Sequence, residues 1–195
     1  MKKSGAKTGY ELIRSSRRTV GMSLDREGNI IVRAPYLCPR ATIERFVAEH
    51  ADWIEKQRSK LKRSAETAQF AGALSEADIK LLAKQMKAVL PEKLSRYASV
   101  LGVSFGRVTV RCQKSKWGSC SAQGNLNFNC LLMLAPEEVL DYVIIHELCH
   151  RRHMDHSKDF WADVALACPG YGDCRRWLRT EGPALMMRAE RKTHA

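Results

Sequence analysis

A chain of 195 residues with 45% apolar residues can bury a sizeable core, so we expect one compact body with a small appended lobe. The longest apolar run, residues 130–135, is far shorter than the roughly 20 residues of a membrane-spanning helix, and no apolar run follows the basic first residues, which argues against membrane and secreted proteins. The net charge of +12 suggests a polyanionic partner, either nucleic acid or acidic protein.

The number and spacing of the cysteines indicate whether the protein is expected in a reducing or an oxidising compartment. There are seven, an odd number, they are scattered, and no Cys-x-x-Cys pair occurs. This pattern argues against a disulfide framework and against a structural zinc ribbon. Reduced thiols in a cytoplasmic protein are the expectation.

The first part of the chain predicts a β-hairpin followed by a helix. Residues 10–34 alternate between apolar and polar residues on either side of the turn-forming segment 25–29. After Pro39, apolar residues recur at helical spacing over 43–61. We therefore expect 1–64 to form an N-terminal lobe of a hairpin plus a helix.

The segment 64–74 is mostly small and polar, which predicts a linker. Ser75 and Asp78 then form a capping-box pattern at the start of an apolar stripe that continues to a glycine at position 102. Pro91 lies inside this stripe, where it removes a backbone donor, so we expect a kink or a break there.

Two strands and a loop are expected next. Apolar and polar residues alternate over 108–112 and again over 125–132. The intervening loop, 113–124, contains Trp117 among polar residues, which makes it a candidate rim of a binding cleft. The alternative is an ordinary connection in which Trp117 packs on the core.

The next helix carries the chemistry. It is expected to begin at Pro136, to end near residue 152, and to contain the His-Glu-x-x-His pattern of His146, Glu147 and His150. A spacing of four residues places both imidazoles on one helix face, where they can share one tetrahedral Zn²⁺. Neutral imidazoles leave the ion's charge uncompensated, so water activated by zinc can be deprotonated by Glu147 as general base.

A catalytic zinc site needs a third protein ligand. His156 is favoured, because a turn after the helix can bring its ring back, and Ser157 is a plausible cap for a following helix that would clamp this turn. His153 and Cys120 remain alternatives. Cys149, inside the motif, is expected to point into the core.

Several segments resemble the YgjP-like metallopeptidases, relatives of the SprT-like and WLM zincins. The resemblance implies an α+β, zincin-like metallopeptidase domain, with its active-site helix packed on a small sheet, zinc ligands His146, His150 and His156, and Glu147 as base. The matching segments are residues 117–120, 134–136, 142–150, 156–157 and 160–161, with 34–35 and 53–54 in the first lobe. We expect this domain at 75–182 and a basic tail at 183–195.

The sequence therefore predicts a cytoplasmic zinc metallopeptidase that acts on protein or peptide substrates. An alternative is a non-catalytic, metal-stabilised module that binds nucleic acid through its basic surface. The SprT-like relatives imply a third hypothesis, proteolysis near DNA, with which the positive charge is compatible.

Overall fold

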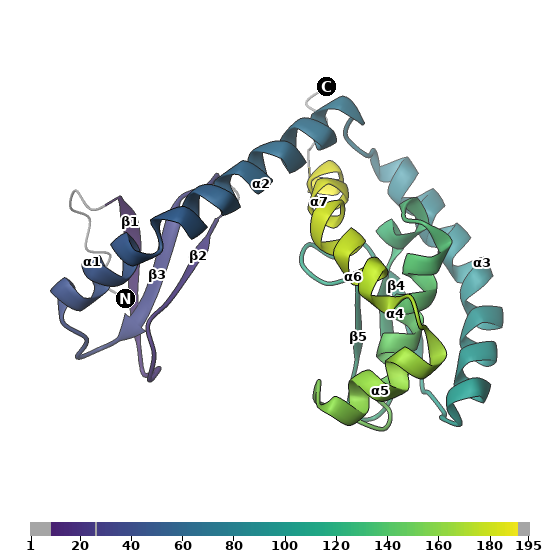
Figure 1. Ribbon diagram of the computed structural model, residues 1–195. Helices are drawn as coiled ribbons and strands as arrows, with labels where there is room; N and C mark the ends of the chain where they lie inside the picture. The colour runs from purple at the N-terminus through teal and green to yellow at the C-terminus, as the bar shows by residue number, and fades with distance from the viewer. Residues whose placement is uncertain (1–8, 26, 191–195) are drawn as a thin grey trace. The chain divides into compact units, whose positions relative to one another are not determined.

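The computed structural model describes residues 9–25 and 27–190 (Figure 1). The chain divides into two compact units, Met1–Arg63 and Ser64–Ala195. Their internal structures are described in turn. No described helix is long and apolar enough to cross a bilayer. All seven cysteines are free thiols.

The first unit contains a three-stranded sheet in the order β1-β3-β2, formed by β1 (Tyr10–Ser15), β2 (Gly21–Leu24) and β3 (Ile30–Pro35). The hairpin expected over 10–34 is present as the antiparallel pair β2 and β3. The arm expected from residue 10 is divided into two strands, β1 and β2, and β1 pairs in parallel with β3, which the sequence did not predict. The central strand therefore supplies most of the buried face.

Two helices cover this sheet where one was expected. α1 (Arg40–Glu49) is capped by His50, whose backbone N–H donates a hydrogen bond to the carbonyl of Val47. α2 (Ala51–Phe70) follows directly. Ile43 and Ile54 pack against the buried residues of β3. α2 continues through 64–70 of the expected linker, because alanines such as Ala68, which is buried, favour a helix.

In the second unit, α3 (Glu76–Leu101) begins with the predicted capping box, in which the Ser75 hydroxyl accepts from the Asp78 N–H and the Asp78 carboxylate accepts from Ser75. Gly102 ends it at a φ of 63°, a conformation that favours glycine. The helix runs through Pro91 without the break that we considered. Buried Leu90 and Leu94 on either side hold this stretch in the core.

The sheet of the second unit has the order β4-β6-β5, with β4 (Val108–Arg111) parallel to β6 (Leu126–Asn129) and β5 (Gly118–Cys120) antiparallel to it. The two expected strands are present but shorter. After β6 the chain forms the 3-10 helix η1 (Cys130–Leu134), because the Asn129 side chain accepts from the Leu131 N–H. β5 lies inside the segment expected to be a loop.

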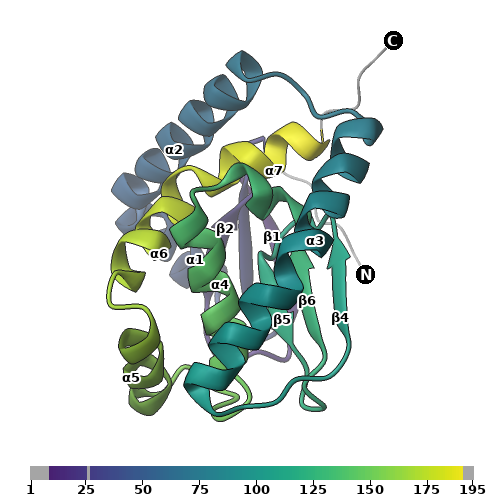
Figure 2. The ribbon, with the colours of Figure 1, turned by 90° about the vertical axis from the view of Figure 1, so that its right-hand side faces the viewer.

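Four further helices complete the unit: α4 (Glu137–Cys149), α5 (Lys158–Ala167), α6 (Tyr171–Thr180) and α7 (Gly182–Glu190). In Figure 2, α3 and α4 lie over the strands β4, β6 and β5, with α3 in contact with β4 and α4 in contact with β5. The expected α+β class is confirmed, with the motif-bearing helix on a small sheet.

The expected basic tail at 183–195 is wrong for residues 183–190, which form α7. Ala184 is buried, the Arg188 side chain donates to the carbonyl of Gly72, and the Leu74 N–H donates to the carbonyl of Arg188. The charge of this segment suggested solvent, but its apolar face packs on the core. Residues 191–195 lie outside the described part of the chain.

Candidate metal centre

The pattern of His146, Glu147 and His150 lies in the last turn of α4. This helix begins after Pro136, with Glu137 and Glu138 suiting the positive end of its dipole. Most of its side chains are buried, so the helix is a fixed core element rather than a surface helix. Its regular part ends at Cys149, and His150 is the capping residue.

His156 reaches the same place from the turn after α4. Its neighbour Ser157 caps α5 by accepting from the Phe160 N–H, as the sequence predicted, and the Asp155 carboxylate accepts from the Ser157 N–H. These two contacts fix the end of the turn. The chain reverses direction in this turn, so the His156 ring lies beside the His146 ring.

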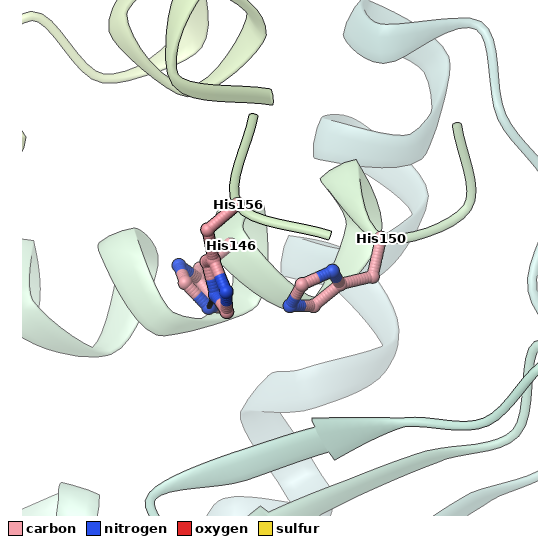
Figure 3. A group of neighbouring side chains, drawn as sticks. All are labelled: His146, His150 and His156. Carbon is pink, nitrogen blue, oxygen red and sulfur yellow. Dashed lines mark hydrogen bonds between the residues drawn. The ribbon is translucent and has the colours of Figure 1, made fainter. Parts of the chain in front are cut away.

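Three imidazoles converge at this point (Figure 3). One nitrogen each of His146, His150 and His156 lie within 4.8 Å of one another, and Nε2 of His146 is 3.2 Å from Nε2 of His156. Nitrogens bound 2.0–2.1 Å from one tetrahedral zinc ion lie about 3.3 Å apart. The spacing therefore fits a shared divalent ion.

The outward nitrogens of two of these rings have protein partners. Nδ1 of His146 is 3.3 Å from the Tyr142 hydroxyl, and Nδ1 of His150 is 2.9 Å from the backbone carbonyl of His153. A carbonyl accepts only, so His150 carries its proton on Nδ1 and leaves the Nε2 lone pair free. Such contacts orient ligating histidines and fix their tautomers.

The site favours neutral rings, the form that binds metal. Burial, followed by the neighbouring His150 and His156 and then by Arg175, lowers the pKa of His146 to about 3. Burial also lowers the pKa of His150, against a hydrogen bond to the His153 carbonyl. At neutral pH both rings therefore offer lone pairs instead of positive charge.

Glu147 is buried beside the histidines, with 5% of its surface exposed. Its Oε2 has no hydrogen-bond partner among the described residues. Burial raises the pKa of Glu147 to about 8, and the charge of Lys116 acts in the opposite direction. An unpaired buried carboxylate oxygen is costly unless a ligand, water or ion meets it.

The strand β5 borders this carboxylate. A β-carbon built on Gly118 would lie 2.6 Å from Oε1 of Glu147 and 2.7 Å from its Cγ. Glycine is therefore the residue that lets the strand approach the helix this closely. The sequence did not predict this role for Gly118, because the contact joins segments about thirty residues apart.

The loop before β5 is held by Asn129, which is fully buried. Its side-chain amide donates to the carbonyls of Gln113 and Lys116, and its backbone N–H donates to the carbonyl of Trp117. Trp117 packs on the core and also lines a pocket. Packing of Trp117 on the core is therefore confirmed, whereas a binding role for this loop stays a prediction.

The other candidate ligands lie elsewhere. The ring of His153 faces Asp163 on α5, with Nε2 3.2 Å from Oδ2. The thiol of Cys120 contacts the Ser121 carbonyl and is not part of the histidine group. Cys149 is fully buried, as expected.

Aromatic rings surround the histidines. Phe160 lies 4.7 to 4.9 Å from all three imidazoles, centroid to centroid. Trp161 stacks on His156 at 5.7 Å and 27°, and on Tyr171 at 5.5 Å and 21°. Tyr142, Phe160 and Trp161 lie in segments that resemble the family, but the sequence did not predict their contacts with the histidines. Helical spacing alone could have linked Tyr142 to His146, four residues on.

The chain is similar to one metallopeptidase of known structure and to one family of metallopeptidases. The crystal structure of the metallopeptidase zymogen of Pyrococcus abyssi abylysin is 24% identical, over 47% of this chain and 93% of that chain, with a TM-score of 0.43. No curated protein sequence matches. The sequence profile described as YgjP-like, metallopeptidase domain, matches residues 18–79 and 71–181, most of the length. The chain therefore belongs to the YgjP-like metallopeptidase domain family.

Proposed function

We propose that this protein is a zinc-dependent peptidase in which His146, His150 and His156 hold the ion and Glu147 is the general base. The observation that carries the proposal is the convergence of three imidazoles beside a buried carboxylate with an unpaired oxygen. Burial lowers the pKa of two of these rings, His146 and His150. Membership of a metallopeptidase family supports peptides as the substrate class.

Three nitrogen donors suit zinc, and a set of three leaves a coordination position for reactants. When bound, the ion supplies a Lewis acid that polarises a peptide carbonyl and increases the acidity of water. Tyr142 and the His153 carbonyl keep two of the donor rings in orientation. The rings of Phe160 and Trp161 pack against the donor rings and restrict their movement.

Glu147 moves the proton. As a carboxylate it accepts a proton from the attacking water at Oε2, and it then donates this proton to the amine that leaves. The raised pKa that burial gives Glu147 strengthens it as a base, whereas a nearby cation favours its ionised form. The two effects together suit a group that must gain and lose a proton near neutral pH.

β5 offers a place for the substrate backbone. It is at the edge of its sheet, next to α4, and its Gly118 contacts the Glu147 carboxylate. An extended peptide can pair with such an edge through main-chain hydrogen bonds. Pairing there would bring a peptide bond close to Glu147.

Replacement of the base tests the proposal. Glu147→Gln should bind one zinc ion as the wild type does, but its kcat/KM on a casein-derived peptide mixture should fall about 10²- to 10⁴-fold. The matched control is Glu138→Gln, the same change on the same helix, where the first-turn side chain is exposed. Equal cleavage by Glu147→Gln and wild type would remove Glu147 from this role.

A further inference from the structure

A basic pocket of about 480 Å³ lies between α6 and the segment that precedes β5. Three arginines and two apolar side chains make up most of its lining. The lining residues are Trp117, Gly172, Arg175, Arg176, Leu178 and Arg179. None of them has a role in the proposed chemistry.

Two contacts connect this pocket to the candidate metal centre. Trp117 directly precedes Gly118, which lies against the Glu147 carboxylate. On the other side, the Arg175 guanidinium lies 4.3 Å from the centroid of Trp161, whose ring stacks on His156. One residue, Gly118, therefore separates the pocket wall from the base, and one ring, Trp161, separates Arg175 from His156.

Trp117 is a fixed wall of this pocket. A β-carbon on Gly182, at the start of α7, would lie 2.8 Å from the Trp117 ring, so the indole packs tightly against that backbone. Its backbone carbonyl is held by the Asn129 N–H. A rigid aromatic wall can cover the methylene part of a bound side chain.

The charges of the pocket are only partly neutralised by the protein. Arg176 pairs with Asp173 at 2.7 Å. Within the described residues, no carboxylate lies at ion-pair distance from Arg175 or Arg179. Guanidinium groups bind carboxylates through paired N–H donors, and three of them within five residues attract an anion.

We propose that this pocket is a substrate subsite that binds a carboxylate of the peptide, so the enzyme prefers acidic peptides. The inference rests on the proposed peptidase function. The carboxylate belongs either to an Asp or Glu side chain near the scissile bond or to the peptide's C-terminus. One short helix and one loop residue form the pocket, which suits one or two carboxylates better than a run of nucleic-acid phosphates.

Binding is measured first, without hydrolysis, on Glu147→Gln loaded with zinc. Fluorescein-labelled decapeptides of Ala, Ser and Gly carry a single Glu at successive positions, each matched by a Gln peptide, with free or amidated C-termini. We expect the carboxylate-bearing peptide to bind about 10-fold more tightly than its neutral partner. A Glu peptide that binds more tightly than its Gln partner when both are amidated identifies the side chain. A Gln peptide that binds more tightly with a free than with an amidated C-terminus identifies the C-terminus.

Variants assign the preference to the pocket. In Glu147→Gln protein that also carries Arg175→Gln and Arg179→Gln, the acidic and neutral peptides should bind with affinities within about 2-fold of each other. The control is the double change Arg107→Gln and Arg111→Gln, the same loss of two charges at exposed positions at either end of β4. A thermal melt verifies that each variant is folded. If the double variant does not fold, the single Arg179→Gln variant replaces it and should lose most of the preference.

Hydrolysis by the wild type adds a second readout. When Glu moves along the peptide by one residue, the cleaved bond mapped by mass spectrometry should move by one residue as well. If no peptide is cleaved but the arginine-dependent preference stands, the peptidase proposal fails and the subsite stands.

Three results would overturn the subsite. The first is equal binding of the carboxylate-bearing and neutral peptides, and the second is a preference that survives in the double variant. The third is arginine-dependent binding of a labelled oligothymidylate without any preference among peptides, which would assign the pocket to nucleic acid.

Discussion

Gly118 and Glu147 are in direct contact, because a β-carbon on Gly118 would lie 2.6 Å from Oε1 of the glutamate. The carboxylate is buried and cannot move aside freely. The identity of one residue in a three-residue strand therefore sets the position of the proposed base.

We expect Gly118→Ala to displace the Glu147 carboxylate while the histidines keep their places. A misplacement of about 1 Å can reduce a rate roughly 10²-fold, so kcat should fall by about this factor with zinc content unchanged. Steady-state kinetics and metal analysis measure both. Gly170→Ala is the control, because nothing lies within 4 Å of its β-carbon position. Unchanged kcat in Gly118→Ala would show that the contact does not position the base.

Tyr142→Phe removes the hydroxyl 3.3 Å from Nδ1 of His146. Loss of such an orienting partner lowers metal affinity about 10- to 100-fold, and competition with a chromophoric chelator measures it. The same change at Tyr97, another buried tyrosine in the same core, should leave zinc affinity unaltered. The orienting role is wrong if the two variants bind zinc equally well.

Lys93 on α3 forms ion pairs with Glu137 and Asp141 on α4, and its side chain is 16% exposed. Burial opposes the ammonium charge, but the hydrogen bonds to Asp141 and Glu137 prevail and raise the pKa of Lys93. Lys93→Gln should lower the free energy of unfolding at pH 7 by about 1–3 kcal/mol.

Because the pKa of Lys93 is raised on folding, its ion pairs stabilise the protein fully at any pH below about 10.4, the pKa of lysine in the unfolded chain. This stabilisation is lost as the pH rises through the pKa of Lys93 in the folded protein. Urea denaturation at pH 7, 9 and 11 should therefore give a constant difference between wild type and Lys93→Gln at the first two values and a smaller one at the third. A difference that grows at pH 11 would contradict the ion pair.

The features that the sequence predicted correctly depend on residues close together in the chain. A capping box needs only Ser75 and Asp78, and the relation of His146 to His150 needs only helical spacing, so both were predictable from neighbouring residues. The placement of His156 beside them depends on the turn after α4 and on the cap of α5. The sequence therefore favoured His156 as the third ligand but left His153 and Cys120 as alternatives.

Long-range contacts were not predictable in this way. β5 has three residues, Gly-Ser-Cys, which have no apolar alternation and form a strand only through pairing with β6. Residues 183–190 were expected to begin a basic tail but form α7, because the packing of Ala184 depends on residues distant in the sequence. For the same reason, the contact of Gly118 with Glu147 required the fold.

Zinc content of purified protein tests the central claim most directly, with wild type compared with His156→Ala and His153→Ala after equilibration against a chelator. We predict about one zinc ion per chain in the wild type and a large loss in His156→Ala. His153→Ala should keep its zinc, because His150 contacts the backbone carbonyl of residue 153 and not its ring. Full zinc in His156→Ala, or a wild type that binds no zinc even in excess, would contradict the account.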